Sequence, residues 1–270
     1  MNSKCINSII VFSLCSTLLD FMIIPQNSII FPRDRTVHII ISAFVAYFFT
    51  LIIEKIDFTK GIQRIALMSV IGVKTVFTIN NFINYFSVFY GSDTFGIIFL
   101  TIVTSIFGYS LKEKSIEQLY AFFVLTNILM LIVILIFSAD KLNVGNIYSN
   151  DISILFSGYK LHIFFDIFTI AAVTPTGKIR KTAQKIYLFT AATMCVALTL
   201  LQGLAVKGNM MYSITPLQAI SQIISGTTVR RFDYIITIFQ SVNYFAAIIF
   251  YVWAIKNIFN RGEKVEFEEI

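Results

Sequence analysis

Long apolar runs constrain this chain more than any other feature. Of its 270 residues, 57% are apolar and only 13% are charged, whereas about a quarter of the residues in a soluble domain are charged. A helix needs about 20 mainly apolar residues to cross the hydrocarbon core of a bilayer. The apolar runs lie at 6–24, 37–53, 65–90, 94–111, 119–138, 152–175, 186–206 and 232–258. They predict an all-α membrane protein of about eight transmembrane helices, in a single domain covering 1–270.

Membrane topology explains the excess of basic residues better than a nucleic-acid partner does. The formal net charge is +6, but Lys and Arg are scattered over short connections, and no aromatic-basic binding motif accompanies them. If the N-terminus lies inside, the inside connections hold thirteen Lys and Arg residues and the outside connections hold six. Both termini are therefore predicted to be cytoplasmic. The lipid bilayer is an expected partner, and nucleic acid is not.

The first apolar run resembles a signal peptide in one respect, because Lys4 precedes it. It lacks a small-x-small cleavage site, and Leu14 before Cys15 is too large for a lipoprotein cleavage box. We therefore interpret this run as the first membrane helix.

The chemistry-bearing residues do not form a pattern typical of enzymes or metal proteins. The three cysteines have no CxxC spacing and stand in or beside apolar runs, which is typical of small packing residues. The two histidines, His38 and His162, are far apart in the sequence. No nucleophile-base pair or phosphate-binding loop is present. We expect no catalytic activity, no cofactor and no metal site.

Ionisable residues inside the predicted spans need a separate explanation, because each costs at least a few kcal/mol at membrane depth. Asp20 is expected near the outer headgroups, with a ligand or ion contact as the alternative. Lys74 is expected to serve helix packing and to reach partly towards the surface, with a salt bridge to Asp166 or Asp20 as the alternative. Lys160 can reach the outer interface and is less informative.

Asp166 is the least easily explained of these residues, because it lies at least nine residues from either end of its span. Thr169 follows one turn later, on nearly the same face of a helix. Thr174, Pro175 and Gly177 then predict a helix stop, since proline lacks an N–H donor and glycine accepts a left-handed cap. A binding cavity and a plain hydrogen-bonding role in the bundle are equally compatible with Asp166.

Four stretches together resemble the B subunit of spore-germination nutrient receptors, a permease-like family of the amino acid–polyamine–organocation superfamily. PQNSIIFPRDRTVHIIISAFVAYFF resembles the entry to the family's second helix, with Pro25, Arg33 and Asp34 in place. The other three are GIIFLTIVTSIFGYSLKEKSIEQLYAFFVLTNILMLIVILI, FFDIFTIAAVTPTGKIRK and PLQAISQIISGTTVRRFDYIITIFQSVNYFAAIIFY. The chain departs from the family at Thr169, near the position where members of the family often have Glu.

The resemblance implies a fold of ten core helices in two inverted sets of five, which this chain shortens to eight. It also implies that the first and sixth helices are interrupted near the membrane centre, so that their ends bind a substrate. The first break would lie among Ser13, Ser16, Thr17 and Asp20. The ligand-binding residues would then be Ser16, Thr17, Asp20, Phe165, Asp166 and Thr169, with Lys74 as a charge partner.

The function implied by the resemblance is nutrient sensing by a multi-pass protein of the plasma membrane or the spore inner membrane. The chain would bind an amino acid or a similar small nutrient and signal to other germination receptor subunits. A secondary amino-acid transporter coupled to H⁺ or Na⁺ is the first alternative. A non-binding membrane scaffold is the second.

Overall fold

The computed structural model describes residues 3–23, 32–56, 61–90, 94–138, 164–175, 177–205 and 232–268. Apart from short turns these residues are helical, and none of them forms a strand. The helices are α1 (Ser3–Ile23), α2 (Pro32–Ile53), α3 (Gly61–Tyr90), α4 (Thr94–Ser110), α5 (Glu113–Ser138), α6 (Asp166–Val173), α7 (Lys178–Ala205) and α9 (Phe232–Glu268). The predicted all-α class is confirmed.

Each predicted span overlaps one of these helices, which differ in length. Five of them, α2, α3, α5, α7 and α9, are long and apolar enough to cross a membrane. The apolar parts of α1 and α4, Cys5–Phe21 and Phe95–Ser110, are shorter. Only residues 164–175 of the sixth predicted span are described, and they contain the eight-residue helix α6. Lys160 lies outside the described residues.

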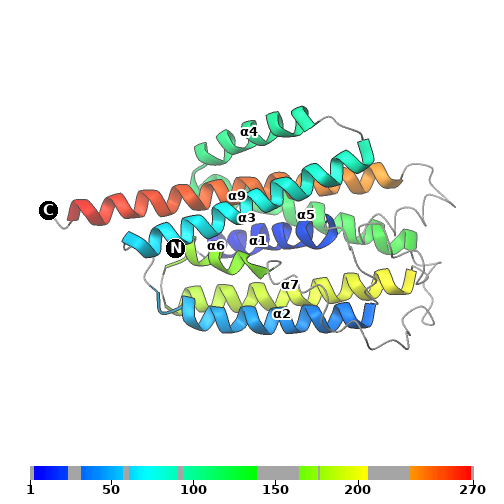
Figure 1. Cartoon of the computed structure of the whole chain (residues 1–270), viewed down its shortest axis with the longest axis horizontal. Coiled ribbons are helices and arrows are strands. Elements are labelled where there is room, and N and C mark those ends of the chain that lie inside the picture. Colours follow the sequence, from blue (N-terminus) through cyan, green and yellow to red (C-terminus); the bar gives the residue numbers. More distant parts are fainter. Residues whose placement is uncertain are drawn as a thin grey trace.

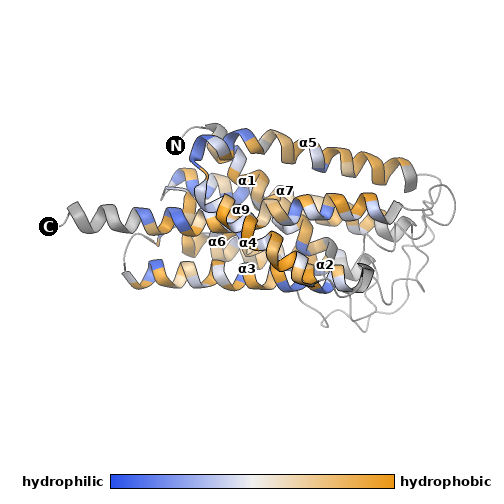
Figure 2. Cartoon of the chain, turned by 90° about the horizontal axis from the view of Figure 1, so that it is seen from above, coloured by the Kyte–Doolittle hydropathy of each residue, from blue (hydrophilic) through white to orange (hydrophobic). Residues whose placement is uncertain are grey.

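The bundle is arranged around α1, which contacts α3, α5, α6, α7 and α9 (Figure 1). Its residues from Ser8 to Phe21 are almost all buried, so α1 has no face towards the surroundings. The outer helices expose apolar side chains instead, and Figure 2 shows that much of their length is hydrophobic. Exposed apolar stripes of this kind suit contact with lipid.

The expected interruption of the first helix is wrong, because α1 runs unbroken from Ser3 to Ile23. This segment contains no glycine or proline, so every peptide group can enter the helical hydrogen-bond pattern. The Thr17 hydroxyl donates to the carbonyl oxygen of Ser13 at 2.9 Å. Such back-bonding satisfies a polar side chain within a continuous helix.

The predicted stop after the sixth span is confirmed at Thr174. Its backbone is extended, and both its N–H and its hydroxyl donate to the carbonyl oxygen of Ile170, at 3.0 and 2.6 Å. Pro175 follows, and Gly177 has a φ of +98°, a left-handed conformation that other residues rarely adopt. The chain can therefore turn sharply into α7.

The start of α1 and the end of α9 lie at the same end of the bundle in both views (Figures 1 and 2). This arrangement suits a chain with both termini on one side of a membrane. The side itself remains a prediction from the distribution of Lys and Arg.

Helix α4 approaches α9 closely at Gly108, which provides a test of the packing. A Cβ atom at Gly108 would lie 3.0 Å from the Cα atom and 3.1 Å from the carbonyl oxygen of Ile249. Gly108→Ala should therefore lower the free energy of unfolding by about 1–3 kcal/mol, the usual cost of overpacking. Thermal unfolding of the purified protein measures the change.

Gly72→Ala is the matched control, because a Cβ atom at Gly72 in α3 would meet nothing within 4 Å. It should leave stability unchanged or raise it by up to about 1 kcal/mol, since alanine favours helix more than glycine does. Equal effects of the two substitutions would contradict the close α4–α9 contact.

Candidate functional site

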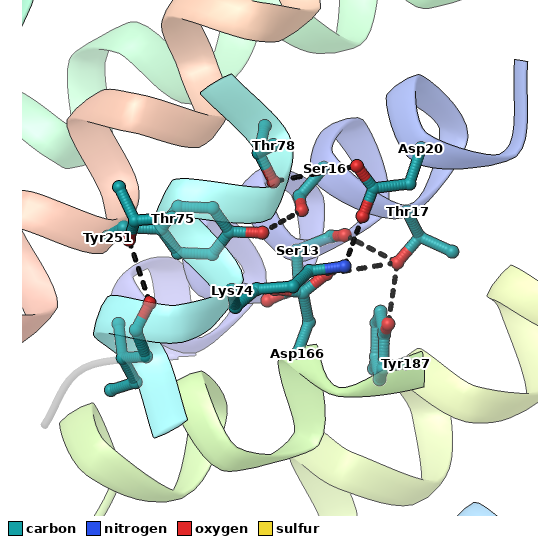
Figure 3. A network of polar contacts seen from close by, with 11 residues as sticks. Ser13, Ser16, Thr17, Asp20, Lys74, Thr75, Thr78, Asp166, Tyr187 and Tyr251 are labelled. Carbon is teal, nitrogen blue, oxygen red and sulfur yellow. Dashed lines mark hydrogen bonds and ion pairs between the residues drawn. The ribbon is translucent and has the colours of Figure 1, made fainter. Parts of the chain in front are cut away.

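Three charged side chains from separate helices meet inside the bundle (Figure 3). Lys74 of α3 forms an ion pair with Asp20 of α1, and its Nζ lies 4.0 Å from Oδ2 of Asp166 in α6. The three side chains are at most 2% exposed. We call Asp20, Lys74 and Asp166 the charge cluster.

Asp20 and Lys74 both lie inside the bundle, as expected if Lys74 serves helix packing. As whole residues, Asp20 is 1% exposed and Lys74 is 3% exposed. Lys74 stands on the buried stripe of α3, with Ile71 one turn before it and Thr78 one turn after it. Its side chain therefore points into the bundle, and the alternative of a salt bridge is confirmed with both acids.

Hydroxyl groups lie around the charge cluster and donate hydrogen bonds to some of its carboxylate oxygens. Thr17 Oγ1 lies 3.3 Å from Asp166 Oδ2 and 2.6 Å from the Tyr187 hydroxyl. Ser16 hydrogen-bonds to the Tyr251 hydroxyl, and the Thr78 hydroxyl donates to Asp20 Oδ1 at 3.5 Å. Buried charges are tolerated when hydrogen bonds of this kind accompany their pairing.

Tyr187 and Tyr251 are parts of the site that the sequence analysis missed. Both are entirely buried, on α7 and α9. A single tyrosine in an apolar run gives no signal of this role, since such residues are common near membrane interfaces. Only the packing of α7 and α9 against α1 brings their hydroxyls to Ser16 and Thr17.

The charge cluster carries more negative than positive charge when all three groups are ionised. Asp166 stands in the first turn of α6, where the helix dipole favours a negative charge. Its Oδ1 atom is buried and has no hydrogen-bond partner in the described part of the chain. The same holds for the hydroxyl of Ser13, on the neighbouring α1. The site therefore retains capacity to accept a donor or a cation.

Five of the predicted site residues come together: Ser16, Thr17, Asp20, Lys74 and Asp166. The other two do not. Phe165 is half-buried, and its ring contacts that of Phe168 with centroids 5.8 Å apart. Thr169 is buried on α6, but it makes no hydrogen bond to the charge cluster among the residues the structure describes.

The far end of α6 is held by Arg180, which the sequence analysis treated only as part of a basic connection. Arg180 is 3% exposed. Its guanidinium donates to the carbonyl oxygens of Ile53 and Ile56, at 3.3 and 3.0 Å, and of Thr174, at 3.1 Å. It thus satisfies carbonyl groups at the C-terminal ends of both α2 and α6.

A second polar contact joins α1, α5 and α9. The side-chain amides of Asn127 and Asn243 donate to each other's oxygens at 3.0 and 3.1 Å. Asn127 also donates to the sulfur of Cys15 at 3.2 Å. Because these amides largely satisfy one another, we interpret this contact as structural.

The ammonium group of Lys74 lies between the carboxylates of Asp20 and Asp166 in the charge cluster. Two described cavities, of about 420 and 390 Å³, lie elsewhere, between α4 and α9 and among α3, α4 and α9. Within the described ranges no group of three or more His, Cys, Asp or Glu residues is placed to hold a metal ion. A ligand of the charge cluster would therefore have to displace a side chain that now occupies it.

Comparisons of the chain with protein-family models, with curated proteins and with solved structures find no match.

The coupling between Asp20 and Lys74 can be measured with a double-mutant cycle. Lys74→Met should lower the free energy of unfolding by about 3–5 kcal/mol, because it leaves two buried carboxylates without a cation. Asp20→Asn should lower it by less, because Asp166 remains beside Lys74. The two losses should not add in the double variant, since the residues are in direct contact.

The exposed pair of Lys181 and Glu54 is the matched control. Its Nζ and Oε2 atoms are 2.9 Å apart, but the two side chains are 39% and 23% exposed. Lys181→Met and Glu54→Gln should give a coupling of only about 0–1 kcal/mol. A coupling equally small for Asp20 and Lys74 would show that the buried pair contributes no more than a surface pair.

Proposed function

We propose that this chain is a permease-like membrane subunit that binds a small nutrient such as an amino acid and passes the signal to partner subunits. The resemblance to the B subunit of spore-germination receptors suggests this role. The charge cluster is the single observation that carries it. The protein would lie in the plasma membrane or the spore inner membrane, with both termini cytoplasmic.

Burying the three charges of the cluster is costly. Each ion taken out of water costs several kcal/mol, and well-packed apolar residues often hold a buried site together at least as well as an ion pair does. Ionisable residues within membrane helices usually line substrate or ion pathways. Three such residues meeting on α1, α3 and α6 therefore support a ligand-binding role over helix packing alone.

Transport of the nutrient together with H⁺ or Na⁺ is the second candidate. The observation that favours it is the negative balance of the charge cluster, together with the unpartnered Oδ1 atom of Asp166. A cation bound there would neutralise the cluster, and its release on one side of the membrane would couple its movement to that of the nutrient.

Ligand binding by the reconstituted protein tests the proposal. Purified chain in liposomes is incubated with each of the common amino acids in labelled form, and bound and internalised label are counted separately. We expect saturable binding of at least one amino acid without accumulation in the lumen. Accumulation would support the transporter instead, and a lack of saturable binding would support a scaffold.

Asp166→Asn tests the residue at the centre of the proposal. A hydrogen bond to a charged group is worth about 1.5–3 kcal/mol, so the amino-acid affinity should fall at least about tenfold. Glu113→Gln removes the same charge at an exposed position of α5 and should leave the affinity unchanged. Equal affinities of the wild type and Asp166→Asn would remove Asp166 from the site.

A further inference from the structure

The ammonium group of Lys74 is held in a setting built from acceptors on other helices. It is paired with Asp20 Oδ2 of α1 and faces Asp166 Oδ2 of α6 at 4.0 Å. The hydroxyl of Thr17 lies 3.3 Å from the same Oδ2 atom of Asp166 (Figure 3). Two carboxylates and nearby hydroxyls suit a primary ammonium, which has three N–H donors and no acceptor.

We propose that Lys74 occupies, as a tethered stand-in, a binding site for the ammonium group of a small primary amine. This inference rests on the proposed function, because it assumes that the charge cluster binds a ligand. It adds that the group recognised is an ammonium and that the Lys74 ammonium fills its place in this structure. An incoming ammonium would take the place of the Lys74 ammonium between Asp20 and Asp166.

The exchange keeps both carboxylates paired before and after the ligand enters. Breaking a buried ion pair is costly because it leaves one charge uncompensated, but replacing one ammonium with another avoids that cost. The flexible stem of lysine allows the side chain to leave while the backbone of α3 stays in place. The ligand affinity is then reduced by the fraction of molecules in which Lys74 fills the site.

The site should discriminate by charge and by N–H donors. A tetraalkylammonium ion has the charge but no N–H group, and a neutral alcohol of similar length has no charge. The first would leave buried carboxylate oxygens without a donor, and the second would supply one O–H donor but no charge to balance them. Sites with buried polar groups reject such analogues strongly.

The test removes the tethered ammonium and supplies a free one. Lys74→Ala deletes most of the side chain and opens space between the two carboxylates. The melting temperature of the purified variant in detergent is measured against increasing n-butylammonium chloride. We expect a saturable rise in the melting temperature, because a ligand that binds only the folded state stabilises it.

Several controls distinguish binding of butylammonium at the Lys74 position from general effects of salt or alcohol on the melting temperature. Tetramethylammonium chloride at equal concentration and n-butanol should produce no saturable rise in Lys74→Ala. Wild type, which keeps its own ammonium, and Lys74→Met, whose side chain fills the space without charge, should respond little to butylammonium. Lys114→Ala, at an exposed position of α5, should also show no response.

A second variant covers the case in which Lys74→Ala does not fold. Lys74→Ala with Asp166→Asn keeps the opened space and Asp20 but has one buried carboxylate fewer. Butylammonium should raise its melting temperature too, with a lower apparent affinity. Failure of butylammonium to stabilise or recover either variant overturns the proposal, and so does an equal response to tetramethylammonium.

The melting temperature of the Lys74 variants in butylammonium chloride is measured without any nutrient, so this test can succeed or fail independently of nutrient binding. Stabilisation of Lys74→Ala by butylammonium, combined with no amino-acid binding by wild type, would keep the ammonium site and reject the nutrient-binding role. Amino-acid binding by wild type without stabilisation of either variant would keep that role and reject Lys74 as the stand-in.

Discussion

The pairing of the Lys74 ammonium with the carboxylates of Asp20 and Asp166 is the contact around which the bundle is organised. Each group would be unstable alone at this depth, since a buried ion costs several kcal/mol when it lacks a partner. The helices α1, α3 and α6 must therefore meet at one level. Helix α1 carries Asp20 into this position because it is buried on all sides, and the other helices pack around it.

Helix α6 connects the charge cluster to one end of the bundle. Its eight residues span about 12 Å, from Asp166 at the charge cluster to the carbonyl end held by Arg180. Gln184 of α7 also donates to the carbonyl oxygen of Ile167 at 3.0 Å. Helix α6 thus joins the charge cluster to the contacts of Arg180 with α2 through one short helix. If the proposed sensing role holds, this helix is the direct connection between the charge cluster and the end of the bundle.

The sequence predicts the helices well because membrane spans need long apolar runs, and it predicts the stop at Thr174 because proline and glycine act locally. It also identifies Asp20, Lys74 and Asp166, since ionisable residues stand out in apolar runs. It does not decide which partner Lys74 pairs with, because that depends on which face of each helix packs inwards. The roles of Tyr187, Tyr251 and Arg180 follow only from contacts between distant segments.

The continuous α1 changes which end of a ligand the charge cluster can recognise. An interrupted first helix would offer free backbone N–H groups to a carboxylate, but α1 keeps its peptide groups in the helix. The N-terminal turn of α6 is the remaining described source beside the cluster, and Asp166 already places a negative charge there. A second carboxylate at that position would be repelled by both acids. If the charge cluster binds a nutrient as proposed, the amine is therefore the end that it can accept, and an amino acid would direct its carboxylate away from Asp20 and Asp166.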